Sequence, residues 1–207
     1  MALVKLNNRG VRSATAFGSV TGLGQLIFIK KVTASASGTV SFVDGASDVV
    51  LDDTYKEYLF TFNNIHPSAD SNLTFQTSTD SGSSYGVTAT TTFFYASHQE
   101  NDGEAAVSYY ASRDLAQSTD FQYLTGDNIE AGDNDGSVSG YLHLFDPSST
   151  TFVKHFTANT DHMAAGPYQQ NNYSAGYFNT TSAIDAVQFK TTSGNMDAGD
   201  ICLYGVK

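Results

Sequence analysis

The chain has 207 residues, of which 40% are hydrophobic and 15% charged, and its formal net charge is −11. This acidity disfavours binding to nucleic acid, the single cysteine excludes an internal disulfide, and no apolar run is long enough to cross a membrane. Ser, Thr, Gly, Asn and Asp gather at the breaks between short apolar runs. That pattern is typical of strands joined by polar turns, so we expect an all-β fold, a single antiparallel β-sandwich of jelly-roll type.

The N-terminal end of the chain is basic, while the rest is acidic. Residues 1–43 contain five basic residues and no acidic ones, and the remainder contains five basic and 21 acidic residues, which gives +5 and −16. Residues 1–24 also contain four glycines and lack an apolar face. We therefore expect an extended arm over residues 1–24 and a β-sandwich domain over residues 25–207. The arm is expected to dock on an acidic partner through Lys5, Arg9 and Arg12.

The first predicted strands run from Leu26 to Val32 and from Thr39 to Val43. The most regular stretch of the chain follows, because Tyr58, Phe60 and Phe62 share one face of an extended segment. Aromatic residues at period two indicate a strand with one strongly apolar side.

A polar stretch, Asn63–Pro67, interrupts this strand, because proline cannot donate to a sheet ladder. Alternation resumes with Leu73, Phe75 and Thr77 on one face. The two alternating runs are adjacent in sequence and have matching apolar faces. We therefore expect them to pair as a central antiparallel pair on one core.

Later strands are less regular, apart from one hairpin. Ser137–Phe145 and Thr151–Thr157 flank the connector Asp-Pro-Ser-Ser, which suits a type I turn. Residues 158–172 are rich in Asn and Gln, and we expect a long polar loop there. The other expected strands are Val87–Tyr95, Val107–Ala111, Phe121–Leu124, Tyr173–Phe178, Ile184–Thr191 and Asp200–Gly205.

Tests for a metal site give weak signals. The acidic loop at residues 126–136 fails the EF-hand template, because counting from Gly136 as position 6 places Leu142 where the template needs Glu. A looser calcium site stays open, but a solvated acidic loop is favoured. His143 and His155 lie on the two hairpin strands, and two imidazoles without a third ligand do not make a zinc site. We expect no metal and no cofactor.

Catalytic motifs are missing from the sequence. Residues 136–140 read G-S-V-S-G, with valine at the position of the nucleophilic serine in the G-x-S-x-G motif. No glycine-rich phosphate loop precedes a helix. We therefore expect a non-enzymatic protein. The 12 tyrosines would suit sugar binding, but they are scattered over the strands, so core and subunit-interface positions are favoured for them.

Three stretches together resemble a known group of proteins. They are M-A-L-V-K-L-N-N-R-G at residues 1–10, Y-K-E-Y-L-F-T-F-N-N-I-H-P at residues 55–67, and F-K-T-T-S-G-N-M-D-A-G-D-I-C-L-Y-G-V at residues 189–206. The combination resembles small virion structural proteins of marine tailed bacteriophages, including those that infect cyanobacteria and abundant marine heterotrophs. The resemblance implies a β-sandwich displayed on the particle and an N-terminal segment that anchors it.

The resemblance and the charge distribution lead to one functional expectation with two alternatives. We expect a capsid-associated decoration or head-fibre protein of the virion, assembled in the host cytoplasm. It would form a homo-oligomer, with a trimer as one option, and dock on the major capsid protein or on tail components. The first alternative is a tail-fibre or tail-appendage module that recognises host surface polysaccharide. The weakest is a hydrolase of such a polysaccharide.

Overall fold

The computed structural model describes residues 26–207, so the predicted arm and its docking residues Lys5, Arg9 and Arg12 lie outside the described residues. The described part is all-β apart from a 3-10 helix, η1 (Ala111–Arg113). The strands are β1 (Leu26–Thr33), β2 (Val40–Val43), β3 (Glu57–Pro67), β4 (Leu73–Ser78), β5 (Ala89–Gln99), β6 (Ala105–Tyr109), β7 (Ala116–Ser118), β8 (Gln122–Tyr123), β9 (Val138–Phe145), β10 (Lys154–Met163), β11 (Tyr168–Phe178), β12 (Ala186–Thr191) and β13 (Met196–Val206).

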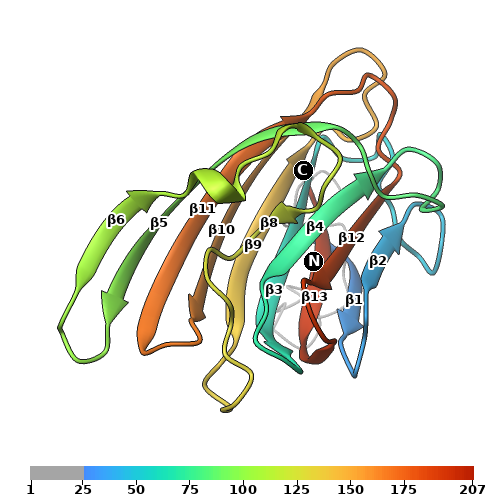
Figure 1. Cartoon of the computed structure of the whole chain (residues 1–207). Helices are drawn as coiled ribbons and strands as arrows, with labels where there is room; N and C mark the ends of the chain where they lie inside the picture. The colour runs from blue at the N-terminus through green and yellow to red at the C-terminus, as the bar shows by residue number, and fades with distance from the viewer. Residues whose placement is uncertain (1–25) are drawn as a thin grey trace, which may run out of the picture.

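These strands form two antiparallel sheets that pack face to face, which confirms the predicted β-sandwich. The large sheet has the order β1-β13-β3-β9-β10-β11-β5-β6, with β7 also paired to β5, and the small sheet has the order β2-β12-β4-β8. Each strand of the small sheet is preceded and followed in sequence by a strand of the large one. In Figure 1 the small sheet lies in front of one half of the large sheet, and β5 and β6 extend beyond it.

An aromatic core fills the space between the sheets. Tyr58, Phe60 and Phe62 of β3 are fully buried, as their alternation predicts. Phe189 of the small sheet packs edge-on against Phe60 and Phe62, with ring centroids 5.3 and 5.2 Å apart. Phe75 of β4 meets Phe156 of the large sheet at 4.9 Å. Such edge-to-face contacts add about 0.5–1.5 kcal/mol each to the burial of the rings.

The predicted pairing of the two central runs is wrong. β3 pairs with β13 and β9 in the large sheet, while β4 pairs with β12 and β8 in the small one. The matching apolar faces meet across the core and not along a ladder. A period-two pattern fixes which side chains face the core, but it does not say to which sheet a strand belongs.

The predicted break at residues 63–67 is also wrong, because β3 runs on to Pro67. Its pairing with β9 shifts register between Phe62 and Ile65, and Asn64 between them has a φ of 50°. This bulge accommodates the polar residues without ending the strand. Proline is tolerated at the last position, where the strand leaves the sheet.

A second correction concerns residues 158–172, predicted as a long polar loop. β10 continues to Met163 and β11 begins at Tyr168, and the two strands pair over their whole length. The hairpin of β9 and β10 is confirmed, although β10 is longer than expected. Cys202, the cysteine of the chain, is buried in β13.

Candidate binding cleft

The chain between β6 and β8 folds back over the edge of the sandwich and makes a cleft with the outer surface of the small sheet. Gln76 on the outer side of β4 donates from Nε2 to the carbonyl oxygens of Thr119 and Asp120, at 3.0 and 2.8 Å. Gln122, which is buried, donates to the carbonyl oxygen of Arg113 at 3.1 Å. These bonds fix the segment in place. The resulting cleft has a volume of about 590 Å³, within the range of ~300–1,000 Å³ typical of small-molecule sites.

The floor of the cleft is a row of three residues on neighbouring strands. Lys190 of β12 is directly opposite Thr74 of β4, and Thr74 is directly opposite Tyr123 of β8. Directly opposed residues in an antiparallel sheet project from the same face. Since neighbouring strands are ~4.8 Å apart, the backbones of Lys190 and Tyr123 are separated by about 10 Å. Thr74 itself is only 1% exposed, so the open part of the cleft lies beside the Lys190 and Tyr123 side chains and not directly above Thr74.

Arg113 forms one wall and is held in a fixed orientation. Its Nε donates to the carbonyl oxygen of Gly126 at 2.8 Å. The guanidinium carbon lies 4.3 Å from the ring centroid of Tyr123 and 5.0 Å from that of Tyr110. Cation–π contacts with two rings hold the group against the wall. The two terminal nitrogens make no hydrogen bond to residues 26–207, so they remain free to donate.

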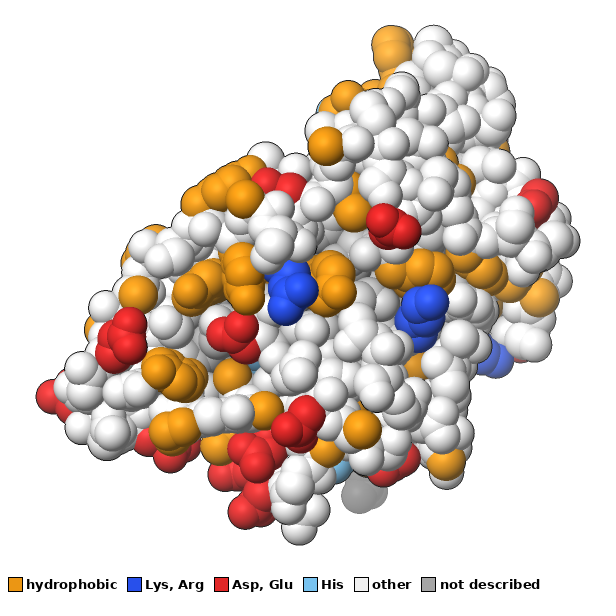
Figure 2. Space-filling view, viewed as in Figure 1, with side chains coloured by type: hydrophobic (Ala, Val, Ile, Leu, Met, Phe, Trp, Pro, Cys, Tyr) orange, Lys and Arg blue, Asp and Glu red, His pale blue; other side chains and the backbone are white. Residues whose placement is uncertain are grey.

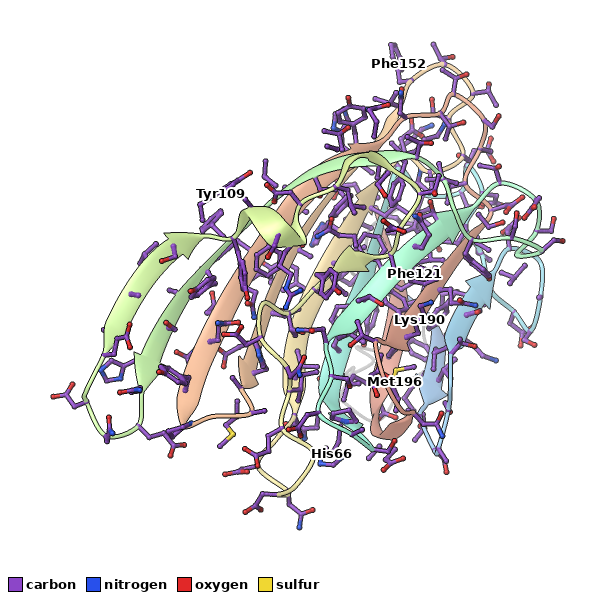
Figure 3. The ribbon with its side chains drawn as sticks, in the orientation of Figure 1. His66, Tyr109, Phe121, Phe152, Lys190 and Met196 are labelled. Atoms are coloured by element: carbon purple, nitrogen blue, oxygen red, sulfur yellow. The ribbon has the colours of Figure 1, made fainter. Side chains whose placement is uncertain are left out.

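Lys190 lies on the opposite side, with its Nζ 3.8 Å from the ring centroid of Phe121. Figure 3 shows the two side chains next to each other at the surface of the small sheet. Neither Lys190 nor Arg113 takes part in an ion pair within residues 26–207. Residues 26–207 carry seven basic and 21 acidic side chains, which gives a net charge of −14. Two of these seven basic side chains are thus brought together in one cleft.

Asp114 supplies an acceptor in the same cleft. Tyr109 donates its hydroxyl to Oδ2 of this carboxylate, and the bond raises the pKa of Tyr109, which keeps the hydroxyl protonated. Oδ1 is buried and has no hydrogen-bond partner among the described residues. A buried carboxylate oxygen without a partner costs free energy. Because this atom has almost no accessible surface, a ligand hydroxyl in the cleft would satisfy it only if the carboxylate turned toward the cleft.

A buried polar network holds the segment at residues 125–127, next to Arg113. Asn72 donates from Nδ2 to the carbonyl oxygens of Gly126 and Asp127 at 3.2 and 2.7 Å. Asn172 accepts from the backbone N–H of Gly126 at 3.0 Å, and Gln170 accepts from that of Asp127 at 3.0 Å. Because Gly126 is also the acceptor for Arg113, the network positions the cation of the cleft.

The outer face of the large sheet is a second candidate surface. A row of directly opposed residues crosses six strands, β3, β9, β10, β11, β5 and β6: Thr61, Tyr141, Asn159, Tyr173, Phe94 and Tyr109. The row contains four aromatic side chains and no charged one. By strand register, seven of the eight exposed large hydrophobic side chains of the described residues lie on this face, all except Phe152.

The two histidines considered as metal ligands both lie on the second of these surfaces. His143 and His155 share the outer face of the large sheet, where His143 packs against Tyr141 and His155 against Tyr177. Within residues 26–207 no group of three or more His, Cys, Asp or Glu side chains is arranged to hold a metal ion. The acidic loop at 126–136 is exposed over residues 132–135, but Gly126 and Ile129 in its first part are buried. The carboxylates of Asp127, Asp133 and Asp135 are exposed, which agrees with the solvated acidic loop that the sequence favours.

The cleft was not predicted from the sequence, because its residues come from four separate parts of the chain. One signal was present. Arg113 is the only basic residue between Lys56 and Lys154, in a stretch that contains most of the acidic residues. A single basic residue in such an acidic stretch indicates a specific contact, which here is with the rings of Tyr110 and Tyr123.

No protein-family model, curated protein or solved structure matches the chain. None of the helical structure in residues 26–207 is long and apolar enough to cross a membrane.

Proposed function

We propose that the protein is a non-enzymatic structural component of a tailed-phage virion, a capsid-associated decoration or head-fibre protein that docks through its basic N-terminal residues. The observation that carries the proposal is the aromatic row on the outer face of the large sheet, which contains no charged side chain and suits a subunit interface. The resemblance of residues 1–10, 55–67 and 189–206 to virion proteins of marine phages supports the same assignment.

The outer face has the size for a second copy of the chain, and its aromatic row has no charge to oppose one. Eight strands at ~4.8 Å spacing, each about 25 Å long, give a face of roughly 850 Å². Stable interfaces bury about 800 Å² per partner. The body carries a net charge of −14, and two copies would repel each other over most of their surface. The aromatic row is free of charge, so contact there avoids that repulsion.

Strand order supports the finer topology that we propose, a jelly roll with an enlarged sheet. The strands β1-β13-β3-β9 face β2-β12-β4-β8 and alternate between the sheets along the chain. β10, β11, β5 and β6 then lengthen the large sheet. Jelly rolls occur in viral capsid proteins and in lectins, an analogy of fold that is compatible with both virion hypotheses.

Incorporation into particles tests the proposal. Deletion of residues 1–24 is expected to abolish incorporation while leaving the isolated β-sandwich folded. The matched control replaces Lys30, in the described domain, with Gln and should incorporate normally. Many copies per particle indicate the head, and few copies indicate the tail-appendage alternative. Normal incorporation of the truncated chain would refute docking through the N-terminal residues.

A further inference from the structure

The cleft between η1 and the small sheet has a set of groups that no structural role in the sandwich requires. Arg113 and Lys190 are cations without a carboxylate partner among the described residues. Asp114 Oδ1 is a buried acceptor without a donor. Tyr123 and Phe121 present ring surfaces beside the two cations. The two cations and Asp114 Oδ1 each lack a partner that a ligand could supply, while each ring already has a cation over it.

The missing partners define the ligand. Free guanidinium nitrogens and an ammonium group favour a carboxylate or sulfate, and Arg in particular binds such anions with paired hydrogen bonds. An unpartnered carboxylate oxygen favours a hydroxyl donor. Flat rings at the cleft wall favour a ligand with an apolar ring face. A sugar that carries an acidic group combines all three features.

We propose that this cleft binds an anionic saccharide. The anionic group would lie between Arg113 and Lys190, and a ring hydroxyl would donate to Asp114 once its carboxylate turned toward the cleft. Figure 2 shows the corresponding face, where isolated Lys and Arg side chains lie beside hydrophobic ones. The inference concerns the described domain alone, so it does not depend on whether the protein docks on the head or on the tail.

The arrangement also explains how the cleft keeps its shape without a ligand. Arg113 is held by Gly126 and by two rings, and Gly126 is held by the buried Asn72 and Asn172. The cation is therefore oriented before binding, which lowers the entropy cost of association. Asp120, which is exposed at the cleft, adds negative charge, so a ligand with an anion at that position is repelled.

Calorimetric titration of the full chain tests the proposal with three probes: tetragalacturonate, a sulfated galactose tetrasaccharide and neutral galactotetraose. We expect one or both anionic probes to bind, at least about 10-fold tighter than the neutral one and more weakly as salt increases. The two anionic probes distinguish a carboxylate-bearing from a sulfate-bearing ligand. Failure of both to bind, or equal binding of the neutral probe, overturns the proposal.

Variants then locate the site. We expect Arg113→Gln and Lys190→Gln each to lower the affinity for the anionic probe by about 10-fold or more. Lys30→Gln, which removes the same charge on β1, is the matched control and should leave binding unchanged. Thermal unfolding checks that each variant is folded. If Arg113→Gln is unfolded, the affinity of Lys190→Gln alone decides whether the ligand binds in this cleft. Unchanged affinity in the folded cleft variants would place the ligand elsewhere and refute the assignment.

Discussion

Asn172 donates its side-chain amide to Nδ1 of His162 across 3.0 Å, inside the buried network next to the cleft. The orientation of this amide is fixed, because Oδ1 of Asn172 accepts from the backbone N–H of Gly126. Nδ1 of His162 is therefore an acceptor, and Nε2 carries the proton and donates to the carbonyl oxygen of Asp127 at 3.1 Å. The site satisfies a neutral imidazole and has no place for a charged one.

This geometry predicts a loss of stability in mild acid. Burial lowers the pKa of His162 from 6.5 to about 4. The unfolded state therefore takes up a proton at a higher pH than the folded state does. His162 makes its full contribution to the free energy of unfolding above pH 6.5. That contribution, about 3 kcal/mol, is lost as the pH falls towards about 4.

Urea unfolding at a series of pH values measures this effect. His162→Gln keeps an acceptor and a donor but does not titrate, so the part of the pH dependence between about 4 and 6.5 should disappear. His155→Gln, an exposed position on the same strand, should leave the pH dependence as it is. An identical pH dependence in wild type and His162→Gln would show that other groups cause it.

A second prediction concerns Asn72, whose amide donates to backbone carbonyls of residues 125–127. Asn72→Asp places carboxylate oxygens against those carbonyls in a buried position. We expect a loss of at least about 3 kcal/mol in the free energy of unfolding. Asn63→Asp, at an exposed position of β3, should change stability by less than about 0.5 kcal/mol. Equal small effects at both positions would contradict the proposed anchoring.

A third prediction compares two glycines with positive φ. Gly199 has a φ of 103°, and an added Cβ would lie 2.4 Å from the carbonyl oxygen of Asn64 in the bulge of β3. Gly45 has a φ of 73° and open space around it. Gly45→Ala should cost about 1 kcal/mol, from backbone strain alone. Gly199→Ala should cost about 3 kcal/mol or more by urea unfolding, because the bulge must move as well.

A fourth prediction tests the outer face of the large sheet as a subunit interface. Phe94 and Tyr173 stack with ring centroids 4.9 Å apart, and they are 44% and 42% exposed. The double variant Phe94→Ser and Tyr173→Ser should dissociate the oligomer, as measured by light scattering after size exclusion. Phe152→Ser removes an exposed aromatic away from this face and should leave the oligomer intact. A monomeric wild-type protein would contradict the proposed interface.

The sequence predicted the strands better than their arrangement. The alternation of Tyr58, Phe60 and Phe62 reports burial directly, since side chains of a strand point to opposite faces in turn. The pairing of β3 and β4 could not be obtained in this way, because both strands contribute apolar faces to the same core from different sheets.

Polar strands were the other source of error. Gln170 and Asn172 looked like loop residues, yet both are buried in β11, where hydrogen bonds to residues 126, 127 and 160 satisfy them. Composition alone cannot reveal such bonds, because their partners are more than 40 residues away in the case of Gly126 and Asp127. The cleft was missed for the same reason, since Thr74, Arg113 and Lys190 meet only after folding.

The extension of the large sheet beyond the small one has a practical consequence. The tip of the β5–β6 hairpin, residues 100–104, lies at the far end of that extension (Figure 1). It is remote from the aromatic core, and exposed hairpin tips accept insertions readily. A foreign peptide placed between Asn101 and Gly103 should be presented to solvent without disturbing the fold, which makes this hairpin a natural position for engineering the protein as a peptide-display scaffold.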